Sequence, residues 1–313
     1  AAIAGRTDLF SGVTGILTLR GNVTGESTPS PLERSTLAAG ALTLEFAHAP
    51  NAEGQTAPVS QSGADMLQRG NPQPMQLIAT GDARLENKTW TQVDHTDEPR
   101  LFYLIGPEII YNNLTLEARI PGEGRLVVHD PRVQTPATPP AVAAPPAGQA
   151  PFAASGSSMF HWMSGLEMTR DADNLFTIVM SGGVDAIHRD LKNNETVFRG
   201  DTLQASALRT PSERPNAPAN AASGGAIDLG GTMDLRRLRG LGSIFVRTPQ
   251  RDVTCDEFDY NLISRVSRLA ANPNSNVMVI TRGSPHPMRA QEMEWNMESD
   301  TISISRGAGT VPH

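Results

Sequence analysis

Cysteine, lysine and aromatic residues are scarce in this sequence, and long apolar runs are absent. The single cysteine among the 313 residues, Cys255, excludes an internal disulfide and any zinc cluster built from thiolates. Its neighbours Asp256 and Glu257 are acidic, so no nearby positive charge activates the thiol, and we expect a buried strand residue rather than a nucleophile. No window is long and apolar enough to cross a membrane as a helix.

Charge of one sign is not concentrated in any segment. The formal net charge is -7, no basic run occurs, and no aromatic residues are interleaved with arginines, so we expect no nucleic-acid partner. Lysine occurs only at Lys88 and Lys192, a bias that a G+C-rich genome explains. The chain opens on Ala1 with no methionine and no apolar leader, and we expect a processed protein or a segment of a longer one.

Catalytic signatures are missing as well. The sequence holds no G-x-S-x-G, P-loop or dinucleotide-binding pattern, and its seven histidines are scattered without metal-ligand spacing. Two carboxylate pairs share a strand face, Glu292 with Glu294 and Glu257 with Asp259, which leaves a carbohydrate-active enzyme as an alternative. We expect no enzyme, no cofactor and no metal.

Alternating apolar residues that run through a glycine are the main positive feature. Successive side chains of a strand point to opposite faces, so each such stretch has one apolar face and one polar face. Three stretches share the pattern: Leu17, Leu19, Gly21 and Val23; Leu77, Ala79, Gly81, Ala83 and Leu85; Ile178, Met180, Gly182, Val184 and Ala186. The sequence therefore predicts an all-β protein with repeated antiparallel units.

A proline-rich segment, residues 131–151, divides the chain. Proline at this density forbids helix and sheet interior and favours an extended spacer. We therefore expect one β-domain over residues 1–130 and another over residues 152–313. Two polar insertions, residues 49–74 and 209–225, have no periodicity and are expected to be mobile loops. A helix is expected, if anywhere, only over 65–69 or 160–169.

An aromatic residue followed by asparagine recurs between strands. Tyr111-Asn112, Tyr260-Asn261 and Trp295-Asn296 each follow one β-run and precede another. The aromatic side chain is suited to pack across a sheet, and asparagine tolerates the turn conformation that starts the next strand. The recurrence indicates strand pairs that form repeated units.

The repeated unit resembles the OstA-like family of β-jelly-roll domains in lipopolysaccharide transport. The resemblance is clearest from Met233 to Gly309, in the runs 256–261, 291–296 and 302–309, and a weaker copy spans Met75 to Val128. The chain departs from the family's compact periplasmic member in its proline-rich segment and its two polar insertions. Asparagine also replaces the more usual aspartate after the aromatic residue.

The resemblance implies a fold, a partner and a location. Two repeats would form antiparallel V-shaped rolls whose apolar groove holds or conducts the acyl chains of lipopolysaccharide, in the periplasm or envelope of a Gram-negative bacterium. Other β-roll proteins would join by edge-strand addition. The candidate groove residues are Leu17, Leu19, Leu77, Leu104, Ile110, Phe176, Ile178, Met180, Phe245, Phe258, Tyr260 and Trp295.

Two other functions remain open from the residues alone. A structural or adhesive extracellular β-protein without a lipid ligand would show the same alternation, because the apolar faces would then form an ordinary closed core. A carbohydrate-active enzyme is the third possibility, although few aromatic residues are available to stack against sugars.

Overall fold

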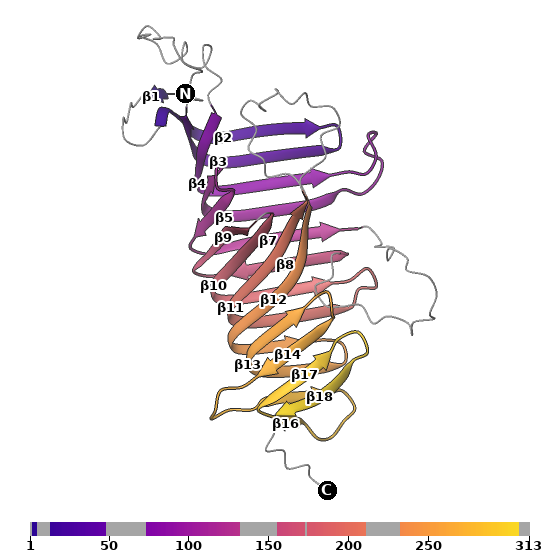
Figure 1. The fold of residues 1–313 in the computed structure, drawn as a ribbon. Coiled ribbons are helices and arrows are strands. Elements are labelled where there is room, and N and C mark those ends of the chain that lie inside the picture. Colours follow the sequence, from indigo (N-terminus) through magenta and orange to yellow (C-terminus); the bar gives the residue numbers. More distant parts are fainter. Residues whose placement is uncertain are drawn as a thin grey trace.

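Strands account for all the regular secondary structure that is described. The computed structural model describes residues 2–4, 13–47, 73–131, 155–172, 174–210 and 232–306. Within these residues the chain forms an 18-stranded antiparallel sheet with its strands stacked from β2 near the N-terminus to β18 near the C-terminus (Figure 1). This part of the chain contains no helix that could span a membrane.

The strands differ greatly in length. The longest are β2 (Val13–Ser30), β3 (Glu33–Ala47), β4 (Gln73–Thr89), β5 (Arg100–Asn112), β10 (Leu175–Arg189), β11 (Glu195–Thr210), β12 (Thr232–Arg247) and β13 (Arg251–Asn261). The shorter ones are β1 (Ala2–Ala4), β6 (Glu117–Pro121), β7 (Gly124–Asp130), β8 (Gly156–Trp162), β9 (Gly165–Ala172), β14 (Val266–Ala270), β15 (Val277–Thr281), β16 (Met288–Ala290), β17 (Glu292–Asn296) and β18 (Thr301–Arg306).

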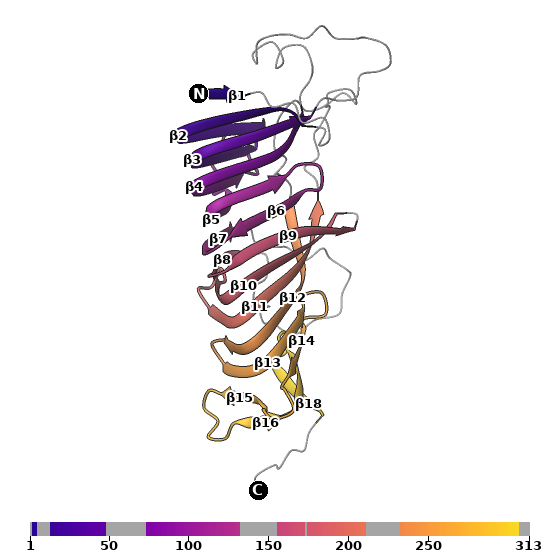
Figure 2. The same ribbon diagram turned by 90° about the vertical axis from the view of Figure 1, so that its left-hand side faces the viewer.

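Each long strand contributes to two half-sheets. One end of β5 pairs with β6 and the other with β7, and β10 is shared in the same way between β9 and β8. β13 is likewise shared between β14 and β15. The first half-sheet therefore continues through β6, β9, β14, β17 and β18, and the second through β7, β8, β15 and β16 (Figures 1 and 2).

Glycines mark the corners where the strands pass from one half-sheet to the other. The pairing register shifts at Thr80/Ala83 in β4 and at Ser181/Val184 in β10. Gly81 and Gly182 lie in these corners with φ of +78° and +86°, a left-handed conformation that costs other residues a steric penalty. The glycine within each alternating stretch is therefore a bend, and the apolar residues on both sides of it still face inward.

The two predicted domains are joined by direct strand pairing. Ala118 of β6 pairs with Met168 of β9, and Leu126 of β7 pairs with Phe160 of β8. The proline-rich segment between them lies mostly outside the described residues. The strand stack nevertheless runs through this junction without interruption.

The structure confirms the all-β antiparallel fold class. It contradicts the expectation of a possible helix over residues 160–169, which belong to β8 and β9. Alternation of Leu166, Met168 and their neighbours suits a strand, and pairing with β10 on one side decides it. The possible helix over 65–69 and nearly all of both polar insertions lie outside the described residues.

Candidate functional site

A continuous row of side chains, the first inner row, crosses the whole first half-sheet. Residues directly opposite each other on paired strands place their side chains on the same face. The pairings join thirteen residues in this way: Leu17, Leu44, Leu77, Tyr111, Ala118, Met168, Ile178, Ala205, Leu238, Tyr260, Ser267, Trp295 and Ile302. At the usual strand spacing the row is ~55 Å long. Its single polar member, Ser267, donates its hydroxyl to the sulfur of Met297 at 2.9 Å.

A second inner row crosses the other half-sheet and is entirely apolar. Its members are Leu37, Leu85, Leu104, Leu126, Phe160, Ala186, Phe198, Val246, Val253, Val279 and Met288. Residues of both rows belong to one hydrophobic cluster. The rings of Phe198 and Phe258, from opposite half-sheets, have centroids 6.0 Å apart. The two inner faces therefore pack against each other.

Burial of the inner side chains varies along the strand stack. Tyr260 and Trp295 expose 0% and 2% of their surface. Toward the N-terminal end and in the middle of the stack, the inner residues Leu19, Leu44, Met168 and Ile178 are only partly buried. These strands therefore offer apolar surface that a ligand could reach.

A polar row borders the apolar interior in the second half-sheet. Cross-strand pairing places five polar residues and two apolar ones side by side: Ser35, Asn87, Phe102, Val128, Ser158, His188 and Thr196. The Asn87 amide donates to Ser35 and to the buried Glu33 carboxylate, both at 2.9 Å. Oγ of Ser158 lies 2.8 Å from Nδ1 of His188, and burial lowers the pKa of this imidazole. The interior thus combines an apolar surface with hydrogen-bonding groups near the strand ends of the second half-sheet.

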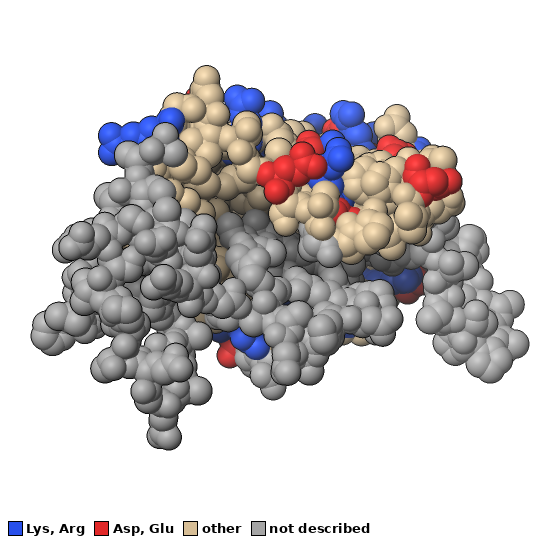
Figure 3. All heavy atoms as spheres, turned by 90° about the horizontal axis from the view of Figure 1, so that it is seen from above, with Lys and Arg blue, Asp and Glu red and all other residues tan. Residues whose placement is uncertain are grey.

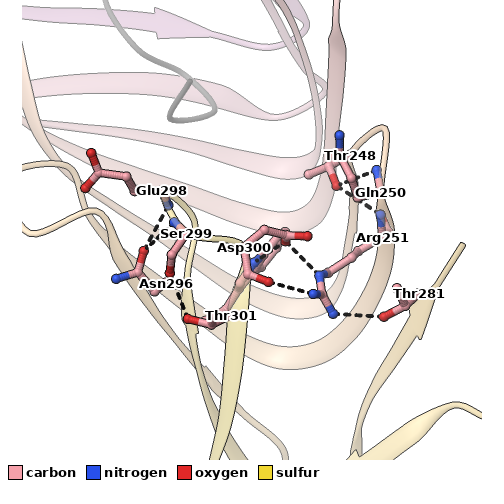
Figure 4. Close-up of polar contacts among 10 residues, drawn as sticks. Thr248, Gln250, Arg251, Thr281, Asn296, Glu298, Ser299, Asp300 and Thr301 are labelled. Carbon is pink, nitrogen blue, oxygen red and sulfur yellow. Dashed lines mark hydrogen bonds and ion pairs between the residues drawn. The ribbon is translucent and has the colours of Figure 1, made fainter. Parts of the chain in front are cut away.

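At the C-terminal end an ion pair joins the turn between β17 and β18, in the first half-sheet, to the start of β13, in the second (Figure 4). Nε of Arg251, at the start of β13, donates to Oδ1 of Asp300 at 2.7 Å. A second guanidinium nitrogen donates to the Thr281 hydroxyl at 2.8 Å, and the Trp295 indole also donates to Asp300, at 3.1 Å. These contacts tie the turn between β17 and β18 to β13 and β15.

Most of the candidate groove residues face the interior. Leu17, Leu77, Ile178, Tyr260 and Trp295 lie in the first inner row, and Leu104 lies in the second. Leu19, Met180 and Phe258 belong to or pack against the same hydrophobic cluster, and Phe176 is 1% exposed on the same face of β10 as Ile178.

Two candidates lie on the outer face of the sheet. Ile110 stands between the buried Ile109 and Tyr111, so alternation turns it outward. Phe245 stands between the buried Ile244 and Val246, and the guanidinium of Arg247 lies 5.1 Å from its ring centroid. Neither belongs to the apolar interior, because each is one residue out of phase with the inner positions of its strand.

Sequence reasoning did not select most of the second inner row. Phe160, Phe198 and Val253 are examples, and all three are flanked by residues of the opposite face. Alternation at Phe198 and Gly200, or at Val277 and Val279, could have identified inward-facing positions in these strands. No sequence pattern indicates that these strands lie opposite the first half-sheet.

Three of the four carboxylates considered for catalysis contact arginines on the outer face, and Glu292 accepts from Arg268 at 3.1 Å. Glu257 accepts from Arg239 at 2.7 Å, and Asp259 is paired with Arg237. The described residues contain no group of three or more His, Cys, Asp and Glu side chains placed to hold a metal. Cys255 is 6% exposed, and burial together with two neighbouring carboxylates raises the pKa of its thiol to about 12.

The described surface offers no dominant charged feature near the N-terminal end. Acidic and basic side chains are interspersed over the part of this face that Figure 3 describes. The candidate site is therefore the apolar interior with its polar border. In comparisons with protein-family models, curated proteins and solved structures, the chain matched none.

Proposed function

We propose that this protein holds or conducts the acyl chains of lipopolysaccharide, or of a similar amphipathic lipid, between its half-sheets in a bacterial envelope. The observation that carries the proposal is the continuity of the two inner rows. Burying each methylene of an acyl chain contributes about 0.8 kcal/mol. An apolar row that crosses thirteen strands offers such burial over a distance greater than one acyl chain needs.

The polar row supports an orientation for the lipid. An amphiphile needs an apolar surface for its chains and hydrogen-bonding partners for its headgroup. Ser35, Asn87, Ser158 and His188 stand beside the apolar second inner row. With the chains against Leu85, Leu126 and their neighbours, uncharged polar groups of the lipid would lie toward this border.

The ends of the strand stack support association with other β-rolls. In the described residues, β1 pairs with Ile16–Thr18 of β2, while residues 23–30 of β2 pair only with β3. The outer side of that segment therefore presents free backbone groups. Such an edge accepts a further strand by backbone hydrogen bonding. A partner added there would extend the second half-sheet and its inner row.

A structural or adhesive role is the second candidate. The complete burial of Phe258, Tyr260 and Trp295 favours it, because a closed core needs no ligand. The two roles differ in what lies against the partly buried inner residues of the middle strands. Lipid should contact these residues in the first role and not in the second.

Photocrosslinking from β10 tests this difference. A benzophenone amino acid at Ile178 faces the interior, while the same residue at the adjacent Val179 faces outward and is the matched control. With purified protein and lipopolysaccharide, mass spectrometry should find lipid adducts at position 178 and far fewer at 179. Equal yields at both positions, or crosslinks at 178 only to the protein's own chain, would contradict the proposal.

A further inference from the structure

Two buried hydrogen-bond donors near the C-terminal end of the interior have no acceptor among the described residues. They are Nε of Arg236 in β12 and the hydroxyl of Tyr260 in β13. Leaving a buried polar group unpaired costs about 1–3 kcal/mol, so a pair of them in one place needs a reason.

The strand register makes the two residues neighbours on adjacent strands. Leu238 pairs with Tyr260, and the Leu262 amide donates to the Arg236 carbonyl at 3.0 Å. Arg236 and Tyr260 are therefore diagonal neighbours, at a Cα separation of about 7–8 Å that long side chains bridge. Arg236 has the same alternation phase as the inner residue Leu238, so both donors lie on the inner side of the first half-sheet.

Arg236 differs from the other two arginines of its strand. Arg237 and Arg239 are on the outer face and are neutralised by Asp259 and Glu257. Arg236 makes no ion pair with a described residue. A local bulge, where the pairing shifts between Ser206 and Ala207, carries Arg236 out of the regular ladder. The strand thus directs two charges to compensated outer positions and one to an inner position with no ion-pair partner among the described residues.

The chemistry of the two groups defines what they can bind. A guanidinium only donates hydrogen bonds and keeps its charge. Burial raises the pKa of the Tyr260 phenol, which therefore remains a protonated donor. The complementary group must supply acceptor oxygens and negative charge, as a phosphate does.

We propose that Arg236 and Tyr260 together bind the phosphate of a lipid headgroup, with its acyl chains against the inner rows. This inference rests on the proposed function, because the lipid that occupies the interior would bring the phosphate. The Tyr260 side chain is 0% exposed, and the turns that carry Arg265 and Glu298 lie close to its phenol. Their charges act on the Tyr260 phenol, and their side chains form an ion pair at 2.5 Å. Both are about two-fifths exposed, at 39% and 44%, so this pair adds little resistance to opening.

The test compares ligands that differ only in the phosphate. Lysophosphatidic acid and a monoacylglycerol with the same acyl chain are titrated calorimetrically into the full chain, below their micelle concentrations. Inorganic phosphate is titrated separately. The variants are Arg236→Gln and Tyr260→Phe, and Arg237→Gln is the matched control, since it removes the same charge from the outer face.

Wild-type protein should bind lysophosphatidic acid about tenfold more tightly than the monoacylglycerol, the effect of a charge-assisted hydrogen bond. Arg236→Gln and Tyr260→Phe should each reduce that ratio severalfold and leave monoacylglycerol binding unchanged. Arg237→Gln should preserve the ratio. Tyr260→Phe removes an unpaired hydroxyl, so it should not lower the unfolding midpoint, which separates a loss of binding from a loss of fold.

The possible results distinguish failure of the phosphate site from failure of the proposed lipid function. Equal affinity for the two lipids, or equal effects of Arg236→Gln and Arg237→Gln, overturns the phosphate site and leaves lipid binding in place. Binding of inorganic phosphate that Arg236→Gln abolishes, without binding of either lipid, supports the anion site and overturns the lipid function. Binding of none of the three ligands overturns both, and the two donors are then satisfied by water.

Discussion

Arg251 and Asp300 connect the two half-sheets across the C-terminal end of the interior. The guanidinium of Arg251 donates to the Asp300 carboxylate at 2.7 Å and to its backbone carbonyl at 2.6 Å. The Arg251 side chain is 12% exposed, so Asp300 compensates a largely buried charge. Around Tyr260 and Trp295 the strands are therefore held together by packing of the interior and by this ion pair.

Removing the charge of Asp300 should loosen this end of the protein. Asp300→Asn keeps a residue that tolerates the left-handed φ of +53° but leaves the Arg251 guanidinium without its counter-charge. We expect the free energy of unfolding to fall by about 1–3 kcal/mol in urea titrations. Asp252→Asn is the control, since Asp252 pairs with Arg247 on the outer face and should cost at most about 1 kcal/mol. Equal losses would show that Asp300 has no special role.

Alanine at a corner glycine should destabilise the fold. Gly81 has a φ of +78°, and a Cβ there would lie 3.2 Å from the Cα of Gly40 in the neighbouring strand. Gly81→Ala should cost about 1–3 kcal/mol by thermal unfolding. Gly25→Ala, where no atom lies within 4 Å and φ is ordinary, should be neutral or slightly stabilising. A corner that accepts alanine as readily as Gly25 would contradict this account.

The asparagine after each buried aromatic residue should be replaceable by aspartate but not by alanine. Oδ1 of Asn261 accepts from the amides of Ile263 and Ser264 at 2.9 and 3.1 Å, and Asn112 and Asn296 make the same two contacts in their turns. Asn261→Ala should lower the stability by about 1 kcal/mol. Asn261→Asp keeps the accepting oxygen and should unfold within error of the wild type. An Asn261→Asp loss as large as that of alanine would show that the amide group itself is needed.

Cys255 should make the protein less stable at alkaline pH. Burial raises the pKa of the folded thiol to about 12, above its ordinary value of 9.0, so the unfolded chain loses the proton first. The thiol's contribution is complete below pH 9 and declines as the pH rises toward 12. Urea unfolding at pH 8 and pH 10.5 should therefore show a steeper loss for wild type than for Cys255→Ala. Parallel losses would contradict the pKa shift. A thiol reagent at pH 8 should label only the unfolded protein.

Much of the architecture could be predicted from local sequence patterns. Alternation identified β2, β4 and β10, because side-chain period depends only on strand geometry. The repeated aromatic–asparagine pair identified three turns whose hydrogen bonds prove identical, because an asparagine side chain reaches amides two and three residues ahead without help from the rest of the fold. The glycines were recognised as recurrent, but their role as corners was not, since a bend and a flat strand give the same alternation.

The candidate site could be predicted only in part for the same reason. Ile110 and Phe245 are apolar and lie in strands, yet each faces outward because register rather than residue type decides the face. Arg236, Arg237 and Arg239 are close in sequence, and nothing in their order reveals which one lacks a partner. A bulge opposite Ala207 decides it.

The sequence by itself determined that this protein is built of antiparallel strands with one apolar face, and that glycine and asparagine interrupt them at fixed kinds of position. These properties follow from dihedral preferences and side-chain alternation, which act over a few residues. Only the tertiary structure decided that Leu17 and Ile302 belong to one row, that Arg251 meets Asp300, and that Arg236 lies diagonal to Tyr260. Those relationships depend on the register between strands that are far apart in the chain. That register is fixed by the packing of the two half-sheets against each other.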